Sequence, residues 1–101
     1  MLQDIVLVDN STVTLKIVTL LLEAMGCTVR CAENGLEAVN EIEKSVPDAV
    51  ITDLIMPKIN GETLCRIIRS RRELDRVTVV ILSAVAAEEE VDFVGLGADA
   101  C

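Results

Sequence analysis

The chain has 101 residues, which suffices for one domain with a single hydrophobic core. Its net charge of -8 and the lack of a long basic stripe argue against direct binding to nucleic acid. There is no histidine, and the four cysteines form no CxxC pair, so the spacing does not favour a structural zinc site. With no secretory leader and no apolar run of membrane length, we expect a cytoplasmic protein with free thiols and no membrane contact.

The first two predicted elements are a strand over residues 5–8 and a helix over residues 11–25. The strand is a short run of aliphatic residues, and Gly26 is a plausible stop for the helix that follows. Apolar residues at helical spacing predict the face that this helix turns toward the core. They are Leu15, Val18, Leu21, Leu22 and Met25.

The later segments continue the same alternation. Asn34 and Gly35 are interpreted as a turn with no further role. The resulting order, βαβαβαβα, predicts an α/β fold with a doubly wound parallel sheet and helices on both faces. Strands are expected over residues 28–32, 49–52 and 77–82, and helices over residues 35–45, 61–70 and 87–94.

Three of the predicted strands end in side chains that carry oxygen. Asp9 follows the first strand, Asp53 the third and Ser83 the fourth. Because the carboxyl ends of parallel strands meet at one edge of a sheet, we expect these groups to converge where open α/β sheets bind ligands. The plainer alternative is that Asp9 and Asp53 merely cap strand ends and turns.

Together, the two carboxylates and the hydroxyl indicate a cation-assisted phosphoryl site. Mg²⁺ prefers oxygen ligands and takes one or two carboxylates together with waters and phosphate oxygens. The Asp53 carboxylate could then attack phosphorus, and the Ser83 hydroxyl could donate to a phosphoryl oxygen. Pro57, shortly after Asp53, makes the adjoining loop rigid, as a cation site requires.

The same residues resemble the receiver domain of bacterial two-component response regulators. The spacing fits that family along the whole chain, so residues 1–101 are expected to form one receiver domain. The motifs that carry the resemblance are Val8-Asp9-Asn10, the stretch from Asp53 through Met56 and Pro57 to Gly61, Ser83-Ala84 and Gly97-Ala98-Asp99.

The resemblance implies a flavodoxin-like, CheY-like sheet of strand order 2-1-3-4-5. It implies that Asp53 accepts a phosphoryl group from the phosphohistidine of a sensor histidine kinase or phosphotransfer protein. Mg²⁺ would be held by Asp9, Asn10, Asp53 and the backbone carbonyl of Ile55, and Ser83 would contact the phosphoryl group on activation. Such a domain switches protein–protein interactions and is not a turnover enzyme.

Two departures from the family alter these expectations. The first strand usually ends in two adjacent acids, but here the second is Asn10, so weaker Mg²⁺ binding is expected. The family also continues past the position of Cys101 with a fifth strand, a lysine that pairs with the phosphoryl group, and a fifth helix. We therefore expect a receiver that is incomplete at its C-terminus, or one that self-associates through the exposed edge of its fourth strand.

Three other functions remain open. Asn10 and the missing lysine favour a degenerate receiver that serves only as an interaction module. A Mg²⁺-dependent phosphatase with an aspartyl nucleophile is disfavoured, because Ile55 stands where such enzymes carry the general acid. A flavin binder is also disfavoured, because the chain has one aromatic residue.

Overall fold

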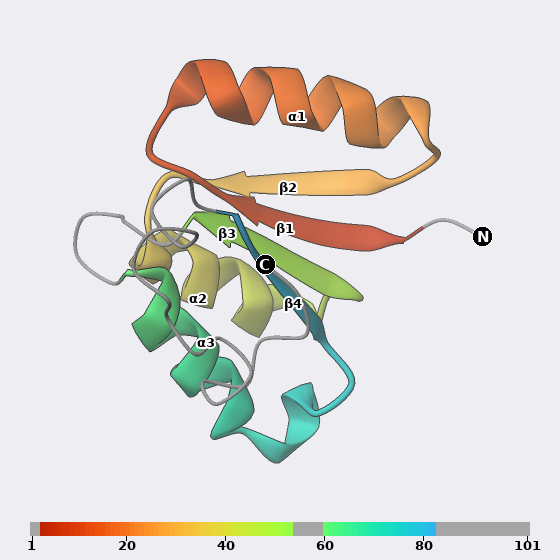
Figure 1. Ribbon diagram of the computed structural model, residues 1–101. Coiled ribbons are helices and arrows are strands. Elements are labelled where there is room, and N and C mark those ends of the chain that lie inside the picture. Colours follow the sequence, from red (N-terminus) through yellow and green to blue (C-terminus); the bar gives the residue numbers. More distant parts are fainter. Residues whose placement is uncertain (1–2, 54–59, 83–101) are drawn as a thin grey trace.

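The computed structural model describes residues 3–53 and 60–82, which fold into a four-stranded parallel sheet (Figure 1). The order β2-β1-β3-β4 agrees with the predicted order as far as these residues extend. The helix predicted over residues 87–94 lies outside the described residues. The strands are β1 (Asp4–Val8), β2 (Thr28–Ala32), β3 (Ala49–Asp53) and β4 (Thr78–Leu82).

Helices cover both faces of the sheet, as the alternating pattern predicted (Figure 1). α1 (Thr12–Ala24) lies on one face, while α2 (Gly35–Lys44) and α3 (Gly61–Arg69) lie on the other. A short 3₁₀ helix, η1 (Arg72–Leu74), precedes β4 and was not predicted. The flavodoxin-like fold class is therefore confirmed.

Each of α1, α2 and α3 begins at a residue whose side-chain oxygen accepts a backbone N–H in the first turn. Ser11 accepts from the Thr14 N–H at 3.2 Å, and Asn60 accepts from the Thr63 N–H at 2.8 Å. Asn34 caps α2 in the same way and is almost fully buried. The interpretation of Asn34 as a plain turn residue was therefore wrong, because its side chain satisfies a backbone donor that the helix leaves unpaired.

The main core lies between the sheet and the two helices α2 and α3. β1 is central, and its residues Ile5 to Val8 are all buried. β3, the other inner strand, alternates between buried and half-buried side chains, so β1 is the inner strand that is buried on both faces. The core cluster comprises Val6, Val8, Ala32, Ala38, Ile42, Val50, Leu64, Cys65, Ile68, Leu74, Val77, Val79 and Ile81.

The inner face of α1 is narrower than the sequence predicted. Leu15 is buried, and Val18 and Leu22 are half-buried, but Leu21 and Met25 are 62% and 77% exposed. Leu21 precedes Leu22 by one residue, which rotates it about 100° around the helix and away from the sheet. α1 therefore carries large apolar residues on its solvent side as well as on its inner side.

Candidate functional site

The register of the sheet brings the two predicted carboxylates to neighbouring positions. Val8 of β1 pairs with Thr52 of β3, so Asp9 and Asp53 are the next residues on two paired parallel strands. Asp53 in turn pairs with Leu82 of β4, the residue before Ser83. Because neighbouring strands lie about 4.8 Å apart, these positions share one short stretch of the sheet edge.

Asp9 is held in a fixed orientation at the start of the loop to α1. Its backbone N–H donates to the Ala32 carbonyl at 3.1 Å, which extends the β1–β2 ladder by one residue. Its Oδ1 accepts from the Ser11 N–H at 2.8 Å, and Ser11 in turn caps α1. Asn10, between them, is exposed. The turn therefore places one half-buried carboxylate and one exposed amide at the edge.

Asp53 is the last residue of β3 and is half-buried. The preceding residue, Thr52, is 1% exposed, and its hydroxyl donates to the Asp53 carbonyl oxygen at 2.9 Å. The backbone of Asp53 is thus anchored at the carboxyl end of β3. Ser83 and Ile55, the other two predicted site residues, lie outside the described residues.

Two carboxylates at this spacing repel each other, and a cation between them relieves that repulsion. The donor set of Asp9, Asp53 and the Asn10 amide oxygen fits Mg²⁺, which takes one or two carboxylates and keeps several waters. Within residues 3–53 and 60–82, no group of three or more His, Cys, Asp or Glu side chains is arranged to hold a metal ion. A Mg²⁺ ion held by these donors would keep several water ligands.

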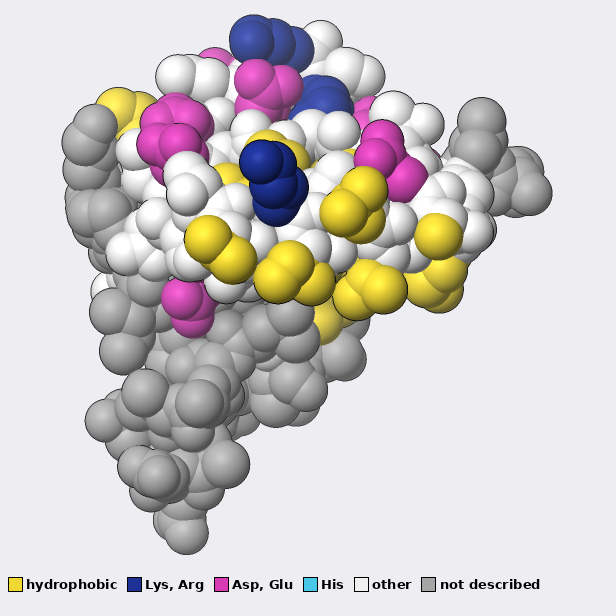
Figure 2. Space-filling view, turned by 90° about the horizontal axis from the view of Figure 1, so that it is seen from above, with side chains coloured by type: hydrophobic (Ala, Val, Ile, Leu, Met, Phe, Trp, Pro, Cys, Tyr) yellow, Lys and Arg dark blue, Asp and Glu magenta, His cyan; other side chains and the backbone are white. Residues whose placement is uncertain are grey.

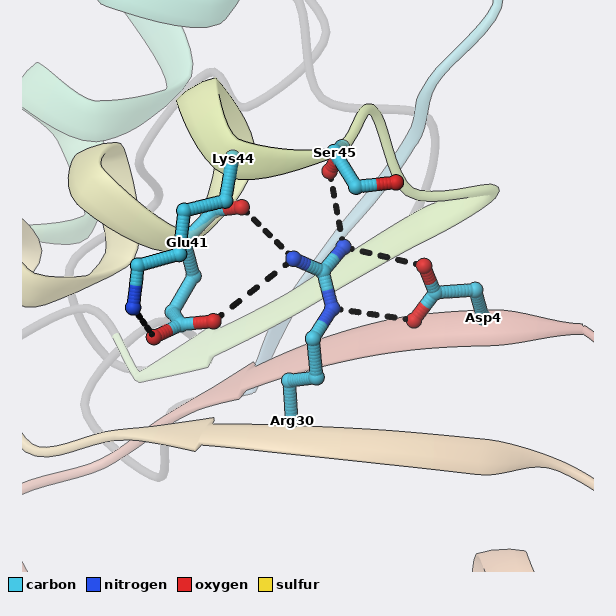
Figure 3. A network of polar contacts seen from close by, with 5 residues as sticks. All are labelled: Asp4, Arg30, Glu41, Lys44 and Ser45. Carbon is cyan, nitrogen blue, oxygen red and sulfur yellow. Dashed lines mark hydrogen bonds and ion pairs between the residues drawn. The ribbon is translucent and has the colours of Figure 1, made fainter.

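The opposite end of the sheet holds a polar network that sequence reasoning missed (Figure 3). We call Asp4, Arg30, Glu41, Lys44 and Ser45 the Arg30 cluster. The Arg30 guanidinium donates to both Asp4 carboxylate oxygens, from Nε at 3.1 Å and from Nη2 at 2.9 Å. It also donates to the backbone carbonyls of Glu41 at 2.6 Å and Ser45 at 2.8 Å. One side chain therefore ties β2 to β1 and to the end of α2.

The Glu41 carboxylate is stabilised in its charged form by its neighbours in this cluster. A hydrogen bond from the Lys44 ammonium at 3.0 Å is the main reason that the pKa of Glu41 lies below its ordinary value of 4.5. Desolvation opposes this effect, and the charges of Lys44 and Arg30 reinforce it. No single sequence motif predicts this cluster, because Arg30 contacts residues that lie 11 to 26 positions away in the sequence.

The described residues also include a surface hollow and three thiols. A surface hollow lined by Val46, Pro47, Asp48 and the segment after α3 opens near the start of β3, at the opposite end of the sheet. Cys27, Cys31 and Cys65 are thiols that form no disulfide within the described part of the chain, as expected. None of the helices in the described part of the chain has the length and apolarity to cross a membrane.

Comparison with known proteins agrees with this geometry. The chain matches the response regulator receiver domain family over residues 5–101. It is 38% identical over 104 residues to a transcriptional regulatory protein, the CpxR homologue of Haemophilus influenzae, covering 99% of this chain and 43% of that protein. It is 34% identical over 86 residues to a gliding motility regulatory protein of Myxococcus xanthus, covering 85% of this chain and 11% of the relative. The chain thus spans less than half the length of these relatives.

Solved structures show the same architecture. A response regulator from Chloroflexus aurantiacus superposes with a TM-score of 0.89 at 28% identity, covering 99% of this chain and 83% of the other. The receiver domain of a sensor histidine kinase from Pseudomonas aeruginosa, described with a magnesium ion coordinated in its active-site cleft, superposes with a TM-score of 0.89 at 26% identity, over the same shares of both chains. By sequence and fold, this chain belongs to the response regulator receiver domain family of two-component systems.

Proposed function

We propose that the chain is a phosphoacceptor in a two-component phosphorelay and that Asp53 is the residue modified. The observation that carries this proposal is the β1–β3 register, which makes Asp9 and Asp53 neighbours at the carboxyl edge of the sheet. Membership of the receiver family supplies the reaction class, and the position of Asp53 at the end of β3 supplies the nucleophile. The donor is the phosphohistidine of a sensor histidine kinase or phosphotransfer protein.

In the proposed step, a carboxylate oxygen of Asp53 attacks phosphorus in line with the P–N bond of the donor. The O–P bond forms as the P–N bond breaks, and the electron pair stays on the imidazole nitrogen, which takes a proton from water. Thr52 and the β3 ladder hold the Asp53 backbone, while the Ser11 N–H fixes the orientation of Asp9. The chain is thus itself modified in the reaction, on Asp53, and does not act as a turnover enzyme.

Mg²⁺ would be held by Asp9, Asn10 and Asp53, together with the Ile55 carbonyl that the family resemblance implies. When bound, it offsets the charge of the carboxylates and of the incoming phosphoryl group. Asn10 contributes an oxygen without a charge, so we propose weaker binding than at a site with two acids on β1.

Phosphorylation by a small donor tests the proposal. The chain is incubated with phosphoramidate, which contains a P–N bond, with Mg²⁺ or with a chelator, and is followed by intact-mass analysis. We expect the mass of one phosphoryl group to be added with Mg²⁺ and lost in Asp53→Asn. Asp75→Asn is the matched control, because it makes the same charge change on an exposed residue beyond η1. Undiminished labelling of Asp53→Asn would show that the acceptor lies elsewhere.

A second candidate function rests on Asn10. If the missing charge prevents the reaction, the domain acts as a phosphorylation-independent interaction module. The same assay separates the two functions, because the module shows no mass gain that depends on Asp53. Restoration of labelling by Asn10→Asp would identify the amide as the cause.

Some expectations about partners and location stay predictions. The receiver domain of a Syntrophus aciditrophicus histidine kinase is also similar to this chain, with a TM-score of 0.89 at 28% identity. The domain can therefore be part of a kinase as well as of a regulator, and its kinase partner is not fixed by the fold. A cytoplasmic location, the absence of nucleic-acid binding and self-association through the β4 edge likewise await measurement.

A further inference from the structure

The solvent side of α1 carries a continuous row of apolar side chains. Figure 2 looks down on this helix and shows hydrophobic side chains gathered along it. Val13, Ile17 and Leu20 are 66%, 55% and 65% exposed, and Ala24 is also exposed. Their spacing of four, three and four residues is the heptad seam by which two helices pack together. We call these four residues the α1 seam.

Two charges flank the α1 seam on the same side. Lys16 and Glu23 are both exposed and stand seven residues apart, which places them about 10 Å apart along the helix axis. At that distance they do not pair with each other, and neither belongs to any of the ion pairs found among the described residues. Each therefore has its charge available to a partner on this face.

The order of these charges selects the orientation of a partner helix. In an antiparallel pair of identical helices related by a two-fold axis, flanking positions of the same kind face each other across the seam. With the axis at the level of Val18 and Thr19, Ile17 faces Leu20 of the partner subunit. Lys16 then lies only about 3 Å along the axis from the level of Glu23 of the partner subunit, and the reciprocal pair forms by symmetry. In a parallel pair, Lys16 would instead face the other flank of the partner helix, which carries the apolar Leu21 of the partner subunit.

We propose that this face of α1 docks a second copy of the chain, helix against helix, in an antiparallel two-fold dimer. This inference does not depend on the phosphoacceptor function. A shallow hollow of about 300 Å³ beside the seam extends the apolar surface toward β2 and offers room for side chains of the second copy. It is lined by Thr12, Leu15, Lys16, Thr19, Leu20 and Cys31.

The size of the surface predicts a weak dimer. The exposed apolar side chains of α1 would bury about 300 Å² on each copy, less than half of the roughly 800 Å² per partner in an interface of standard size. The net charge of -8 on each copy adds repulsion at long range. We therefore expect a concentration-dependent equilibrium that moderate salt strengthens by screening this repulsion.

Sedimentation equilibrium of the 101-residue chain over a range of concentrations tests the proposal. Leu20→Ser should abolish the dimer, and circular dichroism should show that the variant stays folded, since Leu20 lies on the exposed side. Val46→Ser is the matched control, because Val46 is 53% exposed and lies in the loop after α2, away from α1. It should leave the equilibrium unchanged.

Charge exchange tests the antiparallel arrangement itself. Lys16→Glu or Glu23→Lys alone creates two repulsive pairs in the symmetric dimer and should weaken association by about tenfold. The double exchange, Lys16→Glu with Glu23→Lys, should restore association to within about threefold of the original. A chain that stays monomeric at millimolar concentration, a dimer indifferent to Leu20→Ser, or a double exchange that fails to restore association would overturn the proposal.

Discussion

Replacing Arg30 by Met tests whether the Arg30 cluster fastens the end of the sheet opposite to the acidic edge. Met keeps an apolar stem of similar length but removes all the donors. Four hydrogen bonds are lost, two to the Asp4 carboxylate and two to carbonyl oxygens at the C-terminal end of α2. The Glu41 carbonyl also accepts from the Ser45 N–H at 3.4 Å, and the Arg30 donors complete the hydrogen bonding at this end of α2.

The size of the loss follows from the exposure of the partners. Hydrogen bonds to charged groups contribute about 1.5–3 kcal/mol when buried. The Arg30 and Asp4 side chains are 21% and 33% exposed, so water screens the pair and competes for its oxygens. At about 0.5–1 kcal/mol each, the loss of all four bonds lowers the free energy of unfolding by roughly 2–4 kcal/mol. In a domain of this size, that corresponds to a decrease in Tm of about 10 °C or more.

Urea denaturation and thermal melting followed by circular dichroism measure this loss. Lys44→Met is the control, because Lys44 is 69% exposed and makes one surface pair with Glu41 that water screens, so its loss should leave the free energy of unfolding nearly unchanged. Arg30→Lys keeps the charge but cannot form the two-pronged contact with Asp4, so it should recover only a minor part of the stability. An Arg30→Met free energy of unfolding within about 0.5 kcal/mol of the original would refute the reasoning.

Three further predictions concern single residues. Asn10→Asp adds a negative charge beside the proposed cation, and the Coulomb energy of a close pair in water should tighten Mg²⁺ binding about tenfold. Calorimetry measures this affinity, and an unchanged affinity would place the cation elsewhere. Because its folded-state pKa is lowered, ionised Glu41 contributes stability that is fully present above its ordinary pKa of 4.5 and is lost as pH falls through the folded value. The stability difference between the original chain and Glu41→Gln should therefore shrink between about pH 6 and pH 3 in urea melts, and a constant difference would contradict this. Gly26→Ala should lower the free energy of unfolding by about 1–2 kcal/mol, measured in the same urea melts. Gly26 has a φ of +91°, and an added Cβ meets no atom within 4 Å, so backbone strain is the only cost.

The parallel sheet could be predicted because its strands are continuous aliphatic runs between helices. The expected strand over residues 28–32 has the bounds of β2, and the expected helix over residues 11–25 differs from α1 by one residue at each end. η1 escaped prediction because three residues are too few to show a period.

The rotation of α1 could not be predicted because both of its sides are apolar. Leu15 and Leu21 are equally hydrophobic, and only packing on β1 and β2 decides that the first is buried and the second is exposed. Periodicity alone marks an inner face reliably only where polar residues mark the other side.

The acidic edge was predictable in part. Asp9 and Asp53 stand directly after apolar runs, and parallel pairing then makes them neighbours. The Arg30 cluster was not predictable, because Arg30 stands within a strand and its contacts depend on how β1 and α2 lie beside β2. Local patterns reveal which residues end a strand, but not which distant groups a long side chain reaches.

The central claim is that Asp9 and Asp53 meet at one edge of the sheet to bind Mg²⁺. Titration of the isotopically labelled chain with Mg²⁺, followed by amide NMR, tests it most directly. We predict saturable shifts centred on Asp9, Asn10 and Asp53 that disappear in Asp9→Asn, with the amide of Arg30 unaffected. Shifts that persist in Asp9→Asn, or that centre on the opposite end of the sheet, would contradict the account.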